Sequence, residues 1–551
     1  MFTETFLNGN FFWVYASLPA ILLVVHIVPY LIDSHHIRAN GVTGPILARF
    51  SDIWLGWVAT RARRSEVVHA LHKKYGPFVR LAPNQVSISD PDAIKVVYAH
   101  GNGPTKSDYY DVFVVVRANI FSTKSRVEHA RKRKVISHAF SQQSILGFER
   151  YIRQHVAELL DRWDKLCEGG QKGLSGTEAE GWQGCLGRVW FNCMPWFSYW
   201  AFDVIGDLAF GSPFGMIRNA RDVARIAVDP EAAMANYGVV KNETVDESKP
   251  VCAVKEIPAV QILNDRAVPS LGVLPPWIRP FALRSPWYSV GKEAGEGLVG
   301  MAIAAVAKRL VFPTDRTDIL SKLQQGKDEE GKRLSNEELT VEALAQLVAG
   351  SDTISKQVSI HSSIKANPKV QLKLQKELDD ALGVDSSDGP VPTYSQVKNL
   401  PYLEAVINEG MRLHSTIGLG LPRVVPEGGL TVCGKTFPEG TVLSVPMYTV
   451  HRDPEVWGAD ADVFRPERWF ELDAVKLQKS FYPFSFGPRA CVGRNLAMTE
   501  LLLVISSISH RYDIVLEQPG IPLDVQEGLV RKPVSCRVGL KLRNDKIVSD
   551  C

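Results

Sequence analysis

The hydrophobic pattern divides the chain into one continuous apolar segment near its start and a long body in which helical periodicity predominates. Residues 11–32 (FFWVYASLPAILLVVHIVPYLI) contain no Asp, Glu, Lys or Arg. A helix of this length rises about 33 Å, which is enough to cross a bilayer core of about 30 Å. The segment predicts one membrane-spanning helix, so we expect an anchor at residues 1–36 and one large domain at residues 37–551.

The charges on either side of the apolar segment predict its orientation. Glu4 is the only charged residue before it, whereas arginines follow it closely at Arg38, Arg49, Arg61, Arg63 and Arg64. The positive-inside rule then places the body of the protein in the cytoplasm. A cleaved signal peptide is the alternative, but no basic segment precedes the apolar run and no small-residue cleavage site follows it.

Short strand-like pieces lie at both ends of a mostly helical body. Residues 75–91 alternate and turn like a strand pair, and β-like pieces return at residues 418–445 and 521–542. Between about Lys124 and Gly418 the pattern is mostly helical. The expected fold is therefore mainly α with small β sheets.

The longest predicted helix begins at a capping box, Ser335 to Glu338, and no proline follows until Pro368, so about thirty residues can form one helix. Its middle, residues 349–355 (AGSDTIS), combines small residues with polar ones. Two readings remain open for this segment, namely close packing against another helix, or a cavity faced by Asp352 and Thr353. The second half, residues 355–368, is more polar than a buried helix should be.

Composition narrows the class of protein. The chain has 551 residues, 45% of them hydrophobic, and a net charge of +3, which suits a large core and gives no reason to expect nucleic acid as a partner. No repeat or long linker divides the body. Its eight cysteines include no CxxC pair, which argues against a disulfide framework and a structural zinc site.

One cysteine has a distinctive context. Gly487 and Pro488 interrupt regular structure just before Cys491, and the apolar run after it predicts a buried helix. Cys491 is therefore expected at a helix N-terminus, where free N–H groups and the helix dipole favour a thiolate. Such a thiolate suits a nucleophile, a redox centre or a metal ligand.

Two further motifs pair opposite charges. Glu409 and Arg412 lie three residues apart on the helix that Pro401 begins, and so share one face of it. On their own they indicate a surface ion pair. The segment FRPERW, residues 464–469, adds a second arginine, Arg468.

Taken in order, A-G-x-D-T at 349–353, E-x-x-R at 409–412, P-E-R at 466–468 and F-x-x-G-x-R-x-C-x-G at 484–493 strongly resemble the cytochrome P-450 haem-thiolate monooxygenases. The resemblance covers the chain after the anchor. It implies the cytochrome P-450 fold with an N-terminal transmembrane helix and a catalytic domain at residues 37–551. It also implies a single-pass protein of the endoplasmic reticulum membrane whose catalytic domain faces the cytoplasm.

The resemblance implies haem b as cofactor, with Cys491 as the thiolate ligand of the iron, a ligand type that favours cleavage of the O–O bond. Phe484 would shield the sulfur, and Gly487 and Gly493 would let the backbone approach the porphyrin. The implied contacts to the haem propionates are His129, Arg133, Arg423 and Arg489.

The same resemblance assigns two further groups of residues. Asp352 and Thr353 look like the pair that delivers protons to bound O2, while Glu409, Arg412 and Arg468 look like a buried, structural ion-pair triad. Two departures from the family pattern are His129, where tryptophan is frequent, and Ile354, where a second hydroxyl is frequent.

Four segments look like a narrower group, the fungal benzoate para-hydroxylases: residues 128–141, 202–216, 411–423 and 527–533. This implies conversion of benzoate to 4-hydroxybenzoate. Ser415 and Thr416 are candidates to bind the carboxylate, or alternatively cap the helix that carries Glu409. Tyr109 and Tyr110 are candidates to line the entrance.

The chain carries no loop that would bind the phosphates of a nicotinamide or flavin, so the resemblance implies electrons from a separate NADPH-cytochrome P-450 reductase. The basic run of residues 131–134 (RKRK) is either part of the surface that meets this partner or simply a solvated helix face. Two other functions stay open, namely a broader xenobiotic or secondary-metabolite hydroxylase and a haem-binding protein without turnover. Asp352, Thr353 and Cys491 argue against the last of these.

Overall fold

The computed structural model describes residues 17, 21, 24–101, 103–114, 116–229, 254–263, 267–312, 315–358, 364, 366–383 and 389–543. Much of the predicted membrane span, namely residues 11–16, 18–20 and 22–23, lies outside this set. Among the described residues, no helix is both long enough and apolar enough to cross a membrane.

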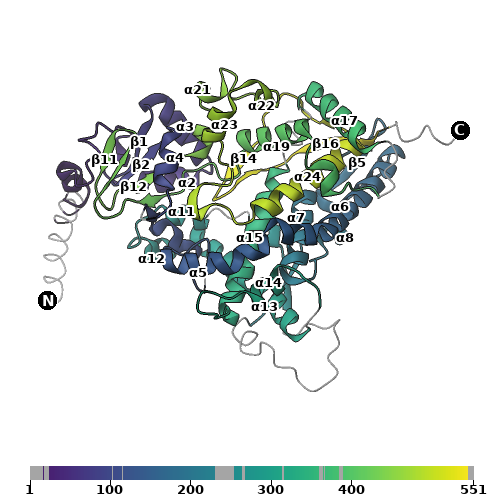
Figure 1. Cartoon of the computed structure of the whole chain (residues 1–551), viewed down its shortest axis with the longest axis horizontal. Helices are drawn as coiled ribbons and strands as arrows, with labels where there is room; N and C mark the ends of the chain where they lie inside the picture. Colours follow the sequence, from purple (N-terminus) through teal and green to yellow (C-terminus); the bar gives the residue numbers. More distant parts are fainter. Residues whose placement is uncertain are drawn as a thin grey trace, which may run out of the picture.

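A five-stranded sheet joins the beginning of the chain to its later part. Its strand order is β1 (Phe78–Ala82), β2 (Gln85–Ile88), β12 (Val442–Ser444), β9 (Arg423–Val424) and β3 (Thr105–Lys106). The strand pair expected at residues 75–91 is confirmed, as are the pieces at 418–445, which also form the hairpin of β10 (Leu430–Val432) and β11 (Lys435–Phe437). These elements lie together at the left of Figure 1.

Four long helices form the centre of the molecule: α6 (Gln142–Gln171), α7 (Met194–Phe210), α15 (Asn336–Gln357) and α24 (Arg494–Arg511). Helix α15 packs against α7 and α24, and α6 packs against the same two helices (Figure 1). Every residue of α7 is buried, and the largest hydrophobic cluster runs through this bundle. Helix α13 (Pro286–Val311) packs against α15 from outside the bundle.

The stretch between Lys124 and Gly418 is mostly helical, as expected, and it also contains two groups of strands. Strands β4 (Ser175–Gly176), β5 (Trp182–Cys185) and β6 (Arg188–Asn192) join β16 (Arg537–Leu542) and β13 (Tyr512–Leu516) in a second five-stranded sheet. Strands β7 (Ala224–Ala227) and β8 (Val254–Ile257) form a further hairpin. Strand β6 pairs with its neighbour β5 across a two-residue turn and with β16, far away in the chain.

Helix α15 begins at the expected capping box, since the Ser335 side chain accepts from the Glu338 N–H and the Glu338 side chain accepts from the Ser335 N–H. It has 22 residues, ends at Gln357, and so accounts for only part of the predicted helix. Residues 359–363 and 365, in the polar second half, lie outside the described set.

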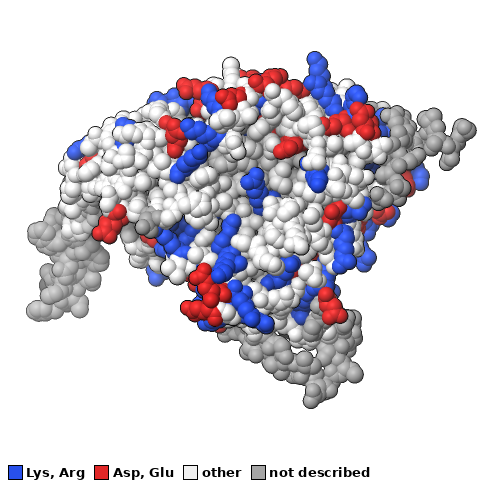
Figure 2. Space-filling model, viewed as in Figure 1, with Lys and Arg blue, Asp and Glu red and all other residues white. Residues whose placement is uncertain are grey.

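The expected last strand pair is confirmed as β14 (Val525–Glu527) and β15 (Arg531–Pro533). On the face seen in Figure 2, lysine and arginine are interspersed with aspartate and glutamate. The other helical segments are η1 (Leu47–Arg49), α2 (Ile53–Thr60), α3 (Arg64–Tyr75), α4 (Asp92–Val97), η2 (Asp108–Phe113), α5 (Arg126–Ser137), η3 (His138–Phe140), η4 (Glu178–Glu180), α8 (Met216–Asn219), α10 (Ala259–Leu263), α11 (Ala267–Gly272), α12 (Arg279–Ala282), α14 (Ile319–Gln325), α17 (Pro368–Leu382), α18 (Tyr394–Val397), α19 (Pro401–Leu413), α20 (Met447–Val450), α21 (Pro454–Trp457), α22 (Arg468–Glu471), α23 (Ala474–Ser480) and η5 (Gly487–Arg489).

Candidate active site

A large internal cavity of about 1970 Å³ brings together the residues that the motifs singled out. Cys491, from the loop before α24, lines it together with Asp352 and Thr353 from the middle of α15. Both readings of the segment 349–355 hold, because a Cβ on Gly350 would lie only 2.7 Å from Ile205 Cγ1 on α7, while Gly350 also lines the cavity. The small residues therefore allow α15 to pack closely on one side and to leave space on the other.

The loop around Cys491 is held by its own backbone. The Cys491 N–H donates to the Phe484 carbonyl at 2.9 Å, and Cys491, Phe484 and Gly493 all line the cavity. Gly487 is not among the lining residues. It has φ of 74°, and a Cβ there would fall 1.9 Å from the Tyr98 carbonyl oxygen, so it lets the turn pass the Tyr98 backbone.

The electrostatic surroundings of Cys491 differ from the simple expectation of a thiolate at a helix N-terminus. The side chain faces the cavity but is otherwise enclosed, and this burial raises the pKa of the Cys491 thiol. The Gly493 N–H, Arg133 and Arg494 act in the opposite direction without overcoming it. Helix α24 begins only at Arg494, so its dipole is not directly at the sulfur. Coordination to a metal ion removes the proton from such a thiol.

The four predicted propionate contacts lie near one another together with Lys106, and of these five residues Arg489 is the one that lines the cavity. His129 feels the positive charges of Arg489, Lys106, Arg133 and Arg423, which together with burial, the largest cause, lower the pKa of His129 to about 3. Burial is also the largest cause for Lys106, whose pKa lies well below its usual value. We call these five residues the propionate cluster.

Four members of the propionate cluster donate hydrogen bonds, and all their acceptors among the described residues are neutral oxygens. Arg489 Nη1 donates to the Thr123 carbonyl at 2.8 Å, and Arg133 Nη1 donates to the Ala490 carbonyl at 2.6 Å. Arg423 Nη1 donates to Tyr110 Oη at 2.7 Å, and Lys106 donates to the Phe121 carbonyl. No described carboxylate pairs with any of them, so the donor set fits a bound group that carries two carboxylates, as haem does.

Lys106 has no place in the sequence motifs. It lies on β3, where it is paired in register with Arg423 on β9. Only this pairing, between positions more than three hundred residues apart, places it in the propionate cluster. A sheet contact of that kind leaves no local signal in the sequence.

Glu409, Arg412 and Arg468 meet at one point, and all three side chains are fully buried. Arg412 Nε lies 2.9 Å from Glu409 Oε2, and Arg468 Nε lies 2.8 Å from Glu409 Oε1. The Glu409 carboxylate also accepts from the Arg465 N–H and from Trp469 Nε1. The surface ion pair that the spacing indicates on its own is therefore not what these residues form.

Asp352 and Thr353 are both engaged by hydrogen bonds. Thr353 Oγ1 donates to the Ala349 carbonyl at 2.6 Å, one helical turn back. Asp352 Oδ1 forms an ion pair with Nζ of Lys532 on β15 at 2.9 Å. The carboxylate and the hydroxyl therefore face the cavity with their acceptor and donor groups held in place.

The four candidate substrate contacts separate into two groups. Thr416 lines the cavity, and its Oγ1 donates to Gln357 Oε1 at 2.6 Å. Ser415 does not line it, because its Oγ donates to the Arg412 carbonyl at the end of α19 and contacts His451 Nδ1. Tyr109 and Tyr110 are buried and are also absent from the cavity lining.

The basic run at residues 131–134 points in several directions. Arg131 forms ion pairs with Glu128 and Glu338, and Lys132 is fully buried with its Nζ 2.9 Å from Glu342 Oε1. Of the four residues, Lys134 has the most exposed side chain, at 53%. Most of this run therefore serves internal contacts.

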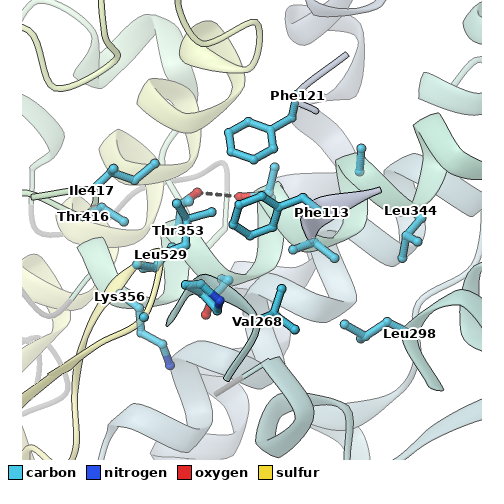
Figure 3. A pocket seen from close by; sticks show the side chains of 18 of the residues that line it. Phe113, Phe121, Val268, Leu298, Leu344, Thr353, Lys356, Thr416, Ile417 and Leu529 are labelled. Carbon is cyan, nitrogen blue, oxygen red and sulfur yellow. Dashed lines mark hydrogen bonds between the residues drawn. The ribbon is translucent and has the colours of Figure 1, made fainter. Parts of the chain in front are cut away.

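The middle of the cavity is apolar. Figure 3 shows Phe113 and Phe121 close to Thr353, with Val268, Leu298, Leu344, Ile417 and Leu529 around them. Aromatic side chains and branched aliphatic side chains together suit a flat hydrophobic ligand.

These features define a cytochrome P450, and comparison with known sequences agrees, since residues 53–540 match the sequence profile of the family described as Cytochrome P450. The chain belongs to that family, whose members bind haem b through a cysteine thiolate, and it is a cytochrome P450 monooxygenase. Such an enzyme uses O2 and takes its electrons from a redox partner.

The chain is similar to a protein named Benzoate 4-monooxygenase bphA, from Aspergillus niger, which is 40% identical over 95% of this chain and 96% of its own. Two others are named only as monooxygenases. Cytochrome P450 monooxygenase cicH of Emericella nidulans is 29% identical over 92% of this chain and 95% of its own. A Cytochrome P450 monooxygenase of Aspergillus terreus is 27% identical over 91% and 94%.

Proposed function

We propose that this enzyme hydroxylates benzoate at the ring carbon opposite the carboxylate and so forms 4-hydroxybenzoate. The observation that carries this proposal is the apolar, aromatic-lined space around Phe113 and Phe121, beside Thr353 and in the same cavity as Cys491. The 40% identity to a protein named benzoate 4-monooxygenase supports the choice of substrate. In the balanced reaction, benzoate, O2, NADPH and a proton give 4-hydroxybenzoate, water and NADP⁺.

The proposed ligand of the haem iron is Cys491, which is the cysteine that lines the cavity. When bound, haem supplies the chemistry that activates O2 for insertion into a C–H bond. Phe484 covers the sulfur, and the Gly493 N–H tunes its charge. The propionate cluster would hold the two propionates. Gly487 would let the loop that carries Cys491 pack against the Tyr98 backbone.

Asp352 and Thr353 are proposed to move protons. The Thr353 hydroxyl can donate at the cavity surface when it releases the Ala349 carbonyl, and Asp352 can resupply the proton through water. The Asp352–Lys532 ion pair holds this carboxylate at the cavity wall. Glu409, Arg412 and Arg468 have a structural role in this proposal, and Thr416 is retained as a substrate contact.

The remaining proposals concern partners and location. Residues 1–36 would anchor the enzyme in the endoplasmic reticulum membrane, with the span at about residues 11–32 and the catalytic domain, residues 37–551, facing the cytoplasm. Electrons would come from an NADPH-cytochrome P-450 reductase, with Lys134 as the exposed member of the basic run. The apolar composition of residues 11–32 and the arginines that follow support this placement.

The direct test is a titration of the purified, oxidised holoenzyme with benzoate, followed by the Soret band, and then turnover with a reductase and NADPH. We expect a saturable spectral shift and 4-hydroxybenzoate as product. Cys491→Ala should lose both the haem spectrum and turnover. Haem binding without any benzoate-dependent shift or product would contradict the proposal and favour a hydroxylase of other aromatic substrates.

A further inference from the structure

The last turn of α15 contributes two polar side chains to the cavity wall, Lys356 and Gln357. They lie three and four residues after Thr353, and residues at these spacings share one face of a helix. Both are more than nine-tenths buried, with 7% and 5% exposure. In the view of Figure 3, Thr353 lies between Phe113 and Lys356, and Leu529 lies on the same side of Thr353 as the lysine.

Lys356 lacks a carboxylate of its own among the described residues. Its Nζ donates to Ser198 Oγ on α7 at 3.3 Å, which is a long hydrogen bond to a neutral group. The nearest carboxylate that acts on it, Asp352, is already paired with Lys532 at 2.9 Å. Together with Lys356 itself, the charges that act on it, Asp352 and Lys532, sum to one positive charge.

Gln357 adds a second donor, its side-chain amide N–H. Its Oε1 accepts from Thr416 Oγ1 at 2.6 Å, which orients the amide. Its Nε2 is fully buried and has no hydrogen-bond partner within the described part of the chain, and Gln357 is one of the residues that line the cavity. Buried polar groups without a partner are rare in folded proteins, so this N–H, on a residue that lines the cavity, is a candidate contact for a ligand.

We propose that Lys356 and Gln357 form an anion site that binds the carboxylate of the substrate, with the Lys356 ammonium and the Gln357 N–H as donors. This inference rests on the proposed function and names the residues that would select an acid over a neutral ring. The site is separate from the propionate cluster, since none of those cations is among the charges that act on Lys356.

The position of the anion site along α15 accounts for the site of hydroxylation. One helical turn rises about 5.4 Å, which is comparable with the length of a benzoate from its carboxylate to the opposite ring carbon. A carboxylate held one turn beyond Thr353 would therefore turn the opposite ring carbon toward Thr353 and the space between Phe113 and Phe121. The enzyme should then prefer aromatic acids over neutral aromatics of the same shape.

The test compares benzoate with benzamide, a neutral molecule of nearly the same shape, by Soret titration of holoenzyme. A hydrogen bond to a charged group corresponds to about 10-fold to 100-fold in affinity. Lys356→Met should weaken benzoate by this factor and change benzamide by about twofold or less. Lys356→Arg should restore most of the benzoate affinity, and Gln357→Leu should weaken benzoate by a smaller factor.

The matched control is Ser351→Ala, on the same helix. Ser351 is fully buried, its Oγ donates to the Leu347 carbonyl at 2.7 Å, and it is not a lining residue, so both affinities should stay as in the wild type. If Lys356→Met weakened benzoate and benzamide equally, the lysine would act through packing and the anion site would be overturned.

The outcomes also separate this inference from the proposed function. Benzoate bound and hydroxylated equally well by Lys356→Met would overturn the anion site and leave the proposed function intact. A wild-type enzyme that ignores benzoate but binds cinnamate or phenylacetate in a Lys356-dependent way would overturn the substrate and support the site. A wild-type holoenzyme that binds none of these acids would overturn both.

Discussion

The enzyme pairs two groups of arginines in opposite ways. Around Glu409, Arg412 and Arg468 share a carboxylate that belongs to the protein itself, at 2.9 and 2.8 Å. In the propionate cluster, Arg133, Arg423 and Arg489 donate to carbonyl and hydroxyl oxygens, and no described carboxylate joins them. The difference teaches that a buried cation whose counter-charge is in the chain stabilises the fold, whereas one without it indicates a bound anion.

Lys356 belongs to the second kind. It is buried, it donates to a neutral hydroxyl, and the carboxylate nearest to it is paired elsewhere. The comparison therefore suggests different experiments for the two kinds of site, because stability should respond to the first and ligand binding to the second.

The largest effect is expected from Glu409→Gln, which leaves Arg412 and Arg468 buried without their carboxylate. Breaking a buried ion pair by removal of one partner costs about 3–5 kcal/mol in the free energy of unfolding. Chemical denaturation should measure this loss, together with a low yield of folded protein. Glu404→Gln, at an exposed position of the same helix α19, is the control and should change little.

Lys356→Met should act on stability in the opposite direction. Burial lowers the pKa of Lys356 to about 8, so below pH 8 the folded protein bears the full cost of a buried charge, and this cost disappears as the pH rises from about 8 to about 10.5. Removal of the charge at pH 7 should stabilise the ligand-free enzyme by about 3 kcal/mol. A destabilised variant in urea denaturation at pH 7 would show that the charge is balanced within the protein.

Arg489→Gln should weaken haem binding and leave the stability of the apoprotein nearly unchanged. We expect the haem to dissociate about 10-fold to 100-fold faster, because one charged hydrogen bond to a propionate is lost, with little change in the unfolding of the apoprotein. The measurement is transfer of haem to an excess of a haem-scavenging protein. Lys165→Gln, at an exposed surface position, is the control. Unchanged haem transfer would remove Arg489 from the propionate cluster.

The smallest effect is a pH dependence of benzoate affinity. As the pH rises through about 8, Lys356 loses its charge, and the dissociation constant of benzoate should rise by less than tenfold between pH 7 and 9. The charged groups that face Lys356 are Asp352 on its own helix and Lys532 on β15, while α7 offers the uncharged Ser198. Soret titrations should show a flat profile for Lys356→Arg, and a flat wild-type profile would speak against a titrating lysine at the site.

The sequence is informative wherever chemistry depends on residues close together in the chain. The loop around Cys491, the pairing of Glu409 with Arg412 and the small residues of α15 all follow from local spacing. The second five-stranded sheet and Lys106 do not, because β6 pairs with β16 and β3 with β9 across hundreds of residues. In the sequence, Lys356 is only a charged residue in a helix that should be buried. The structure shows that it lines the cavity, and this placement is what suggests a ligand-binding role.

The buried contact between Lys132 on α5 and Glu342 on α15, 2.9 Å apart, links the helix that carries His129 and Arg133 to the helix that carries Asp352 and Thr353. Loss of Lys132 alone leaves the buried Glu342 carboxylate without its cation, while replacement of both by apolar residues of similar volume can be neutral. These two positions should therefore co-vary among related sequences. A protein that lost Lys132 before Glu342 would be less stable, so the two substitutions should arise close together.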